Sequence, residues 1–151
     1  MTNRILFVCL GNICRSPSAE AVFSTLAGAA FETDSAGTAN YHIGKAPYGP
    51  MQEAASARDI QMSHLRARQF TAKDFETFDL ILGMDAQNIE DMERLRPQGN
   101  QTPVRNFATY ATAPHDYVPD PYYTRDFEEA LDIIQDASKG LLDQLQDRSA
   151  V

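Results

Sequence analysis

Cys9 and Arg15 are the two residues whose types and spacing point most directly to chemistry. They stand six positions apart, after an apolar run and just before a segment with the features of a helix start. A helix N-terminus and a nearby arginine both favour the thiolate form of a cysteine, which is the nucleophilic form. The planar guanidinium of an arginine also matches two oxygens of a phosphate group. The pair therefore predicts a nucleophile that works beside a bound anion.

The residues between this pair are suited to hold an anion through their backbone. Gly11 and Asn12 are residue types that tolerate the positive φ needed for successive N–H groups to point inward. Ser16 is expected to donate a hydrogen bond to the thiolate. The expected phosphate-binding segment is Leu10, Gly11, Asn12, Ile13, Cys14, Arg15 and Ser16.

This loop must be positioned by the elements on either side of it. Ile5-Leu6-Phe7-Val8 is continuously apolar, which is typical of a strand buried on both faces. A helix is expected over 17–27, with Ser16 as its N-cap, Pro17 at its first position and Glu20 in its first turn. Further strands are expected at 31–36, 80–82 and 104–107, further helices at 51–58, 86–95 and from 127 onward, and a long loop at 108–124.

Strands and helices alternate along the chain, which predicts an α/β fold. We expect a single-domain, doubly wound, four-stranded parallel sheet in the order 2-1-3-4 with helices on both faces. A length of 151 residues with 43% hydrophobic residues suits one globular domain over residues 1–151. Such sheets bind ligands beyond the carboxyl ends of their strands, where Cys9, Ser35 and Asp85 would meet.

The net charge of −8, from 13 basic and 21 acidic residues, speaks against nucleic acid and anionic membranes as partners. The acidity is concentrated late in the chain: residues 1–114 carry ten basic and twelve acidic side chains, and residues 115–151 carry three and nine. Apolar residues recur there at helical spacing, and the acidic residues fall largely elsewhere. We interpret much of this charge as the solvated face of the last helix.

The two cysteines, Cys9 and Cys14, are too few for a disulfide framework or a four-cysteine zinc site. Their closeness suggests a reducing compartment. The only apolar run near the N-terminus is too short to span a membrane and is followed by no signal-peptide cleavage pattern. We therefore expect a soluble, cytoplasmic protein.

Four motifs resemble the low-molecular-weight protein tyrosine phosphatases, in that family's order and over nearly the whole chain. They are Val8-Cys9-Leu10-Gly11-Asn12-Ile13-Cys14-Arg15-Ser16-Pro17, Asp34-Ser35-Ala36-Gly37-Thr38, Phe78-Asp79-Leu80-Ile81-Leu82-Gly83-Met84-Asp85 and Asp120-Pro121-Tyr122-Tyr123. The resemblance implies hydrolysis of phosphotyrosine monoesters through a phosphocysteine on Cys9. Arg15 would hold the phosphate, and Asp120 would act as general acid and then base.

The resemblance also implies roles for residues around this centre. Tyr41 and Tyr122 would form the walls of the substrate pocket, with Tyr123 at its rim or as a target of tyrosine kinases. Ser35 and His64 would brace the phosphate loop, His64 by hydrogen bonding near Asn12. Cys14 would be a resolving thiol that forms a reversible disulfide with oxidised Cys9.

The implied partners are phosphotyrosine-containing proteins or peptides, among them a bacterial tyrosine kinase, with inorganic phosphate as product. No cofactor and no metal is expected, since His42, His64 and His115 form no metal-ligand cluster in the sequence. The acidic chain predicts better binding of peptides with basic residues beside the phosphotyrosine.

Two alternatives stay open. A protein-arginine phosphatase is similar, although Ile13 and Tyr122 both favour phosphotyrosine. A non-catalytic phosphotyrosine-binding module would not need Cys9, Arg15 and Asp120 together. A thioredoxin-coupled arsenate reductase is disfavoured because it requires further cysteines downstream, and none follows Cys14.

Overall fold

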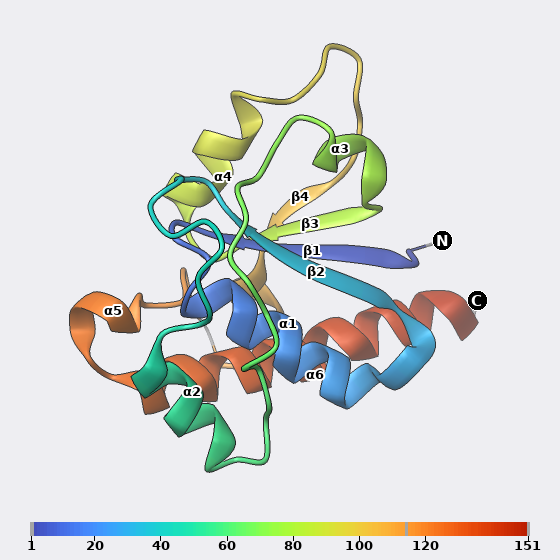
Figure 1. The fold of residues 1–151 in the computed structure, drawn as a ribbon. Coiled ribbons are helices and arrows are strands. Elements are labelled where there is room, and N and C mark those ends of the chain that lie inside the picture. Colours follow the sequence, from blue (N-terminus) through green and yellow to red (C-terminus); the bar gives the residue numbers. More distant parts are fainter. Residues whose placement is uncertain (1, 114, 151) are drawn as a thin grey trace.

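The computed structural model describes residues 2–113 and 115–150, and the side chains of 148–150 are not described. Four parallel strands form one sheet in the order β2-β1-β3-β4 within these residues (Figure 1). The predicted fold class and strand order are therefore confirmed. The strands are β1 (Arg4–Cys9), β2 (Glu32–Gly37), β3 (Leu80–Gly83) and β4 (Val104–Asn106).

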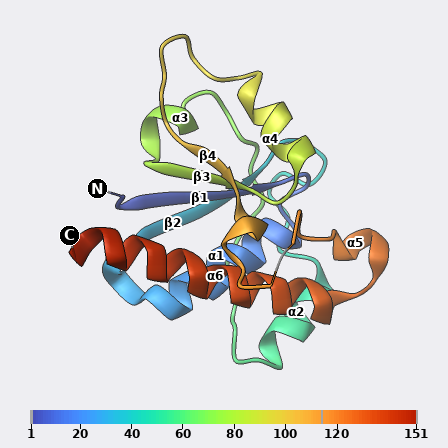
Figure 2. The same ribbon diagram turned by 180° about the vertical axis from the view of Figure 1, so that it is seen from behind.

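Helices cover both faces of this sheet. One face carries α1, α2 and α6, and the other carries α3 and α4, as the two opposite views show (Figures 1 and 2). The strands run so that their carboxyl ends point toward the side of the molecule where α5 lies (Figure 1). The helices are α1 (Arg15–Ala27), α2 (Gly49–Ser56), α3 (Asp74–Thr77), α4 (Ala86–Glu93), α5 (Pro121–Thr124) and α6 (Phe127–Ala150), with short 3₁₀ turns η1 (Gly28–Ala30) and η2 (Phe107–Tyr110).

β1 lies between β2 and β3, and its side chains pack into two separate hydrophobic cores. Because side chains alternate along a strand, Ile5, Phe7 and Cys9 enter the core beneath α1 and α6. Leu6 and Val8 enter the smaller core on the opposite face. All of these side chains except Cys9 are completely buried, and Cys9 is 3% exposed. The end of β1 is thus held from both sides at the point where the phosphate loop begins.

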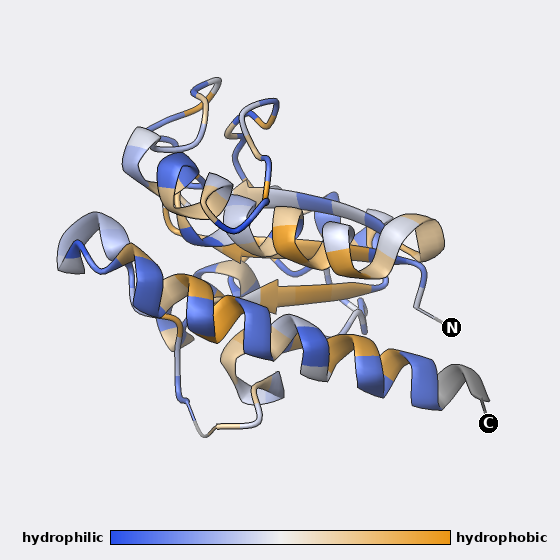
Figure 3. Ribbon diagram, turned by 90° about the horizontal axis from the view of Figure 1, so that it is seen from below, coloured by the Kyte–Doolittle hydropathy of each residue, from blue (hydrophilic) through white to orange (hydrophobic). Residues whose placement is uncertain are grey.

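The long helix α6 buries the apolar stripe that its spacing predicts. Ala130, Leu131, Ile134 and Leu141 are fully buried, while Asp132 is exposed. Figure 3 shows orange on the interior strands and blue on the outward turns of this helix. Much of the C-terminal acidity is therefore a solvated face, as expected. No described helix combines the length and the apolar character needed to cross a membrane.

Several predicted boundaries are wrong by one or two residues, and two short helices, α3 and α5, were missed. The first helix begins at Arg15, with Cys14 as an N-cap that makes no side-chain hydrogen bond, so Ser16 is not its cap. Glu20 consequently lies beyond the first turn. The loop predicted at 108–124 contains α5, and part of η2. Each of the two missed helices, α3 and α5, has only four residues, too few to show a helical period.

Candidate active site

Cys9 ends β1 with its sulfur at the mouth of the phosphate loop. Its Sγ lies 3.1 Å from Ser16 Oγ and accepts the backbone N–H of Asn12 at 3.3 Å. Ser16 is free for this contact because it lies within the first turn of α1 and does not cap the helix. The Asn12 N–H thus donates to the sulfur, and the Ser16 hydroxyl can donate either to it or to the carbonyl of Ala36, 3.3 Å away. Donors at these positions stabilise a thiolate.

Two residues determine the shape of the loop 10–16: Asn12, which has a left-handed backbone conformation, and Gly11, which lies close to His42. Asn12 has a φ of 57°, the positive value expected for this segment. Gly11 has no positive φ; instead, a Cβ at this position would lie 3.0 Å from His42 Cδ2. The need for glycine at position 11 therefore comes from the close approach of His42 and not from the backbone angle expected in the sequence analysis.

A buried hydrogen-bond network holds Asn12 in this conformation. Its Nδ2 donates to Ser16 Oγ at 2.7 Å and to Ser35 Oγ at 3.0 Å. Ser35 Oγ in turn donates to Glu20 Oε1 at 2.7 Å. Burial, and to a lesser extent the charge of Asp34, raises the pKa of Glu20 to about 7. The expected bracing residue Ser35 thus connects the loop to an ionisable carboxyl in α1.

His64 does not occupy the bracing position that the family resemblance implies. The structure places its side chain on the surface. Among the described residues, Asn12 Oδ1 instead accepts the backbone N–H of Arg68 at 3.0 Å. The prediction for His64 is therefore corrected: a main-chain donor four residues later holds the amide.

Arg15 is buried behind the loop and is fixed by two acceptors. Its Nη1 donates to Asp85 Oδ2 at 2.8 Å and to the carbonyl of Val118 at 3.0 Å. Burial alone would lower the pKa of Arg15, but Cys9, Asp85 and Asp120 together raise it above its ordinary value. Arg15 Nε is buried and meets no acceptor among the described residues. One edge of the guanidinium is thus anchored, and other N–H groups are available for an anion.

Asp120 approaches the same guanidinium from the opposite loop. Its Oδ2 lies 3.5 Å from Arg15 Nη2, and its side chain is 23% exposed. Its Oδ1 accepts the backbone N–H of Tyr122 at 3.1 Å, which makes Asp120 the N-cap of α5. Pro121 at the start of α5 restricts the backbone of Asp120 to an extended conformation. The carboxyl is therefore held beside the anion site while it stays accessible to solvent.

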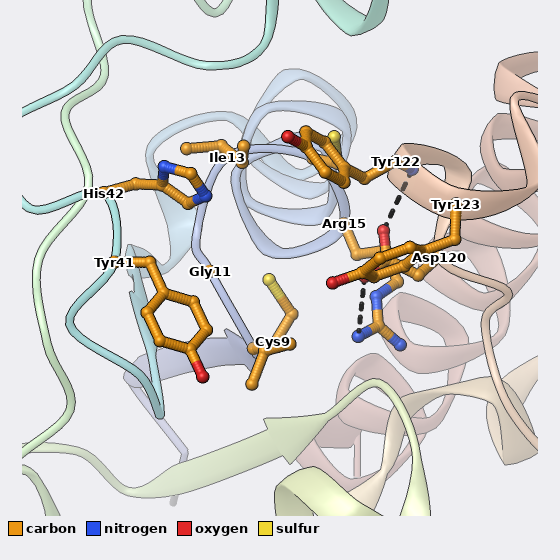
Figure 4. A pocket seen from close by; sticks show the side chains of 11 residues that line it. Cys9, Gly11, Ile13, Arg15, Tyr41, His42, Asp120, Tyr122 and Tyr123 are labelled. Atoms are coloured by element: carbon orange, nitrogen blue, oxygen red, sulfur yellow. Dashed lines mark hydrogen bonds and ion pairs between the residues drawn. The ribbon is translucent and has the colours of Figure 1, made fainter.

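These groups open into one pocket. Figure 4 shows Tyr41 and His42 on one side of it and Tyr122 and Tyr123 on the other. His42 was not predicted as a pocket residue, and its ring lies 6.3 Å from the rings of both Tyr41 and Tyr122. The lining residues are Cys9, Leu10, Gly11, Ile13, Cys14, Arg15, Tyr41, His42, Asp120, Tyr122 and Tyr123. Aromatic walls of this kind suit a flat ring that carries a phosphate.

Cys14 is the second buried thiol that lines this pocket. Burial, with the charges of Asp120 and Cys9, raises the pKa of Cys14 far above its ordinary value. Burial therefore favours the neutral thiol form of Cys14. The described part of the chain contains no group of three His, Cys, Asp or Glu side chains suited to hold a metal ion.

Comparison with known proteins agrees with this geometry. The family model for the low molecular weight phosphotyrosine protein phosphatases matches residues 4–150. YfkJ of Bacillus subtilis, a low molecular weight protein-tyrosine-phosphatase, is 38% identical over 148 residues, which cover 94% of this chain and 95% of YfkJ. The crystal structure of YfkJ matches with a TM-score of 0.92 over 98% of this chain and 97% of that one.

Relatives from two further organisms are also similar to this chain. The human low molecular weight phosphotyrosine protein phosphatase is 42% identical over 132 residues, which cover 83% of each chain. The structure of a Drosophila arginine phosphatase matches with a TM-score of 0.88 and 26% identity, over 96% of this chain and 98% of that one. The family match and the shared fold together define a protein phosphatase. The chain belongs to the low molecular weight phosphotyrosine protein phosphatase family, whose members are enzymes that act on phosphotyrosine.

Proposed function

We propose that this chain hydrolyses phosphotyrosine by nucleophilic attack of Cys9 on phosphorus. The phosphate would occupy the loop, with its equatorial oxygens on the backbone N–H groups and on the free N–H groups of Arg15. Asp120 would protonate the departing tyrosine oxygen, so the bond between phosphorus and that oxygen breaks as the bond to sulfur forms. Inorganic phosphate is the final product.

The second step returns the enzyme to its starting state. Asp120, now a carboxylate, would take a proton from water as the water oxygen attacks the phosphocysteine. The bond between phosphorus and sulfur then breaks, and the electron pair stays on Cys9. Ser16 Oγ, 3.1 Å from Cys9 Sγ, would donate its proton in a hydrogen bond to the leaving thiolate.

One observation carries this proposal: Cys9, Arg15 and Asp120 line the same pocket, and the carboxylate of Asp120 lies 3.5 Å from the guanidinium of Arg15.

Hydrolysis of an aryl phosphate tests the mechanism. Compared with the wild type, activity should be at least about 10³-fold lower in Cys9→Ser and about 10²-fold or more lower in Asp120→Ala. Asp116→Ala, an exposed aspartate outside the pocket, is the matched control for Asp120→Ala and should keep full activity. Full activity of Cys9→Ser would refute the mechanism.

The pocket walls support phosphotyrosine as the substrate. Tyr41 and Tyr122 offer aromatic surface to a phenyl ring, and Ile13 adds an apolar contact. Because one structural relative is an arginine phosphatase, paired phosphotyrosine and phosphoarginine peptides should be compared directly. A strong preference for phosphoarginine would overturn the substrate assignment.

The wider setting belongs to the same proposal. We assign residues 1–151 to one phosphatase domain that acts in the cytoplasm; residues 1, 114 and 151 of this span lie outside the described part. A bacterial tyrosine kinase that carries phosphotyrosine is the proposed protein partner. Loss of phosphotyrosine from such a kinase in the presence of wild type, but not of Cys9→Ser, would support this partner.

Cys14 is proposed to protect Cys9 from irreversible oxidation. Peroxide would convert Cys9 to a sulfenic acid and be reduced to water. The sulfur of Cys14 would then bond to the sulfur of Cys9, and the sulfenic oxygen would leave with the Cys14 proton as a second water. After peroxide treatment, dithiothreitol should restore the activity of the wild type but not that of Cys14→Ser. Equal recovery of both proteins would refute this role.

A further inference from the structure

Two chain segments beside the pocket contain basic residues and no acidic ones. Neither 35–52 nor 60–73 has an Asp or Glu, although the whole chain carries 21 of them. The two segments lie against each other, since the Gly44 N–H donates to the carbonyl of Ala67 and the Ala67 N–H donates to the carbonyl of Lys45. An acid-free surface therefore forms beside the active site of an acidic protein.

Lys45 and Arg66 are the exposed cations where the two segments meet, and we call these two residues the basic wall. Lys73, the third exposed cation of the segments, lies apart from them at the start of α3. Neither Lys45 nor Arg66 makes an ion pair with any residue that the structure describes. Arg66 Nη1 donates only to the carbonyls of Ser63 and Leu65, which leaves its charge uncompensated. Arg68, by contrast, is neutralised by Asp34 and Asp74, so it is not part of the basic wall.

The basic wall adjoins the pocket through His42. Lys45 Nζ lies 3.4 Å from His42 Nδ1, and His42 lines the pocket. Figure 4 shows His42 beside Tyr41, across the pocket from Tyr122. A phosphotyrosine whose ring enters the pocket would therefore pass its neighbouring residues along this edge. Asp120, the one acidic lining residue in the described chain, is already held by Arg15.

We infer that the basic wall selects phosphotyrosine segments that carry acidic side chains next to the phosphotyrosine. This inference rests on the proposed function and names a subclass of its substrates. It is the opposite of the preference expected from the whole-chain charge of −8, much of which lies on α6. Charges close to a bound peptide act more strongly than distant ones, because salt screens interactions beyond about 8–10 Å. The charges of Lys45 and Arg66 should therefore decide which residues are preferred beside the phosphotyrosine.

Three phosphotyrosine peptides that differ only in their flanking residues (Glu, Ala or Lys) test this inference. For the wild type at low salt, kcat/KM should be roughly threefold to tenfold higher with Glu than with Lys flanks, as expected for two exposed ion pairs. The difference should shrink as salt is added. K45E and R66E should each reduce or reverse this order.

K139E is the matched control, because it makes the same charge change at an exposed position of α6. It should leave the order of the three peptides unchanged. A wild type with no flank preference, or with a preference for Lys, would overturn the inference, as would an equal effect of K139E and K45E. If the wild type does not hydrolyse even the Ala-flanked peptide, the proposed function fails and this inference fails with it.

Discussion

Asp85 fixes Arg15 with one carboxylate oxygen while its other oxygen caps a helix. Its Oδ2 lies 2.8 Å from Arg15 Nη1, and its Oδ1 accepts the backbone N–H of Asn88 at 2.8 Å. The start of α4 and the orientation of the Arg15 guanidinium are therefore set by the same side chain. Asp85 follows β3 at the carboxyl edge of the sheet, so one side chain serves both the N-cap of α4 and the contact with Arg15.

The substitution Asp85→Asn should weaken phosphate binding with little effect on the fold. An asparagine can keep the cap through Oδ1 but removes the charge that holds Arg15. Hydrogen bonds to charged groups are worth about 1.5–3 kcal/mol, so kcat/KM for an aryl phosphate should fall roughly 10- to 100-fold. Asp91→Asn, at a surface ion pair on α4, is the control and should change neither activity nor stability measurably. An unchanged kcat/KM in Asp85→Asn would contradict the proposed anchoring.

Ser16→Ala should slow the second chemical step more than the first. The variant loses the hydroxyl that lies 3.1 Å from Cys9 Sγ, so the thiolate becomes a poorer leaving group. Phosphoenzyme should then accumulate, visible as a burst of phenol release in rapid-mixing experiments, with a steady-state rate roughly tenfold or more lower. Ser24→Ala, farther along α1, should behave as the wild type. A slower burst with no phosphoenzyme would place the role of Ser16 in the first step instead.

Gly37→Ala should displace the phosphate loop. A Cβ on Gly37 would lie 2.7 Å from the carbonyl oxygen of Leu10 and 3.2 Å from Asn12 Cβ, and the first of these is backbone. Overpacking costs about 1–3 kcal/mol, and here the loop itself must move. Gly83→Ala is the control, because its Cβ would meet the flexible side chains of Ile89 and Met92 away from the pocket. Both variants should lose stability in urea unfolding, but only Gly37→Ala should lose most of its activity.

Glu20→Gln should change how stability depends on pH. The pKa of Glu20 is about 7 in the folded protein, against an ordinary value of 4.5. Between these values the native state keeps a proton that the unfolded chain loses, so the free energy of unfolding decreases as the pH rises. A glutamine has no such proton, and the variant should therefore gain stability relative to the wild type between pH 4.5 and pH 7.

Urea unfolding at pH 5 and pH 8 measures this difference. Glu53→Gln, an exposed substitution of the same kind on α2, should follow the pH profile of the wild type. Parallel profiles for Glu20→Gln and the wild type would show that Glu20 ionises normally in the native state.

The parts of the fold and site that could be predicted are those with local signatures. A continuously apolar run predicts β1, and the cysteine-to-arginine spacing predicts the loop that follows it. The stripe of α6 is equally local, because each turn of the helix repeats the pattern. Short elements such as α3 and α5 carry no such repeat and depend on neighbours far away in the chain.

The residues that were missed or misplaced depend on contacts between distant segments. His42 reaches the pocket because it packs close to Gly11, about thirty residues earlier in the sequence. The bracing role expected of His64 is taken by the backbone N–H of Arg68. Every residue except proline carries a backbone N–H, so the residue types in the sequence do not indicate which one binds Asn12.

β1 gives Ile5, Phe7 and Cys9 to one core and Leu6 and Val8 to the other. Deleting any single residue of this strand would exchange the two faces and turn the sulfur away from Arg15. The number of residues in β1 therefore sets the direction in which the Cys9 sulfur points, so the six residues of this strand allow no insertion or deletion within it.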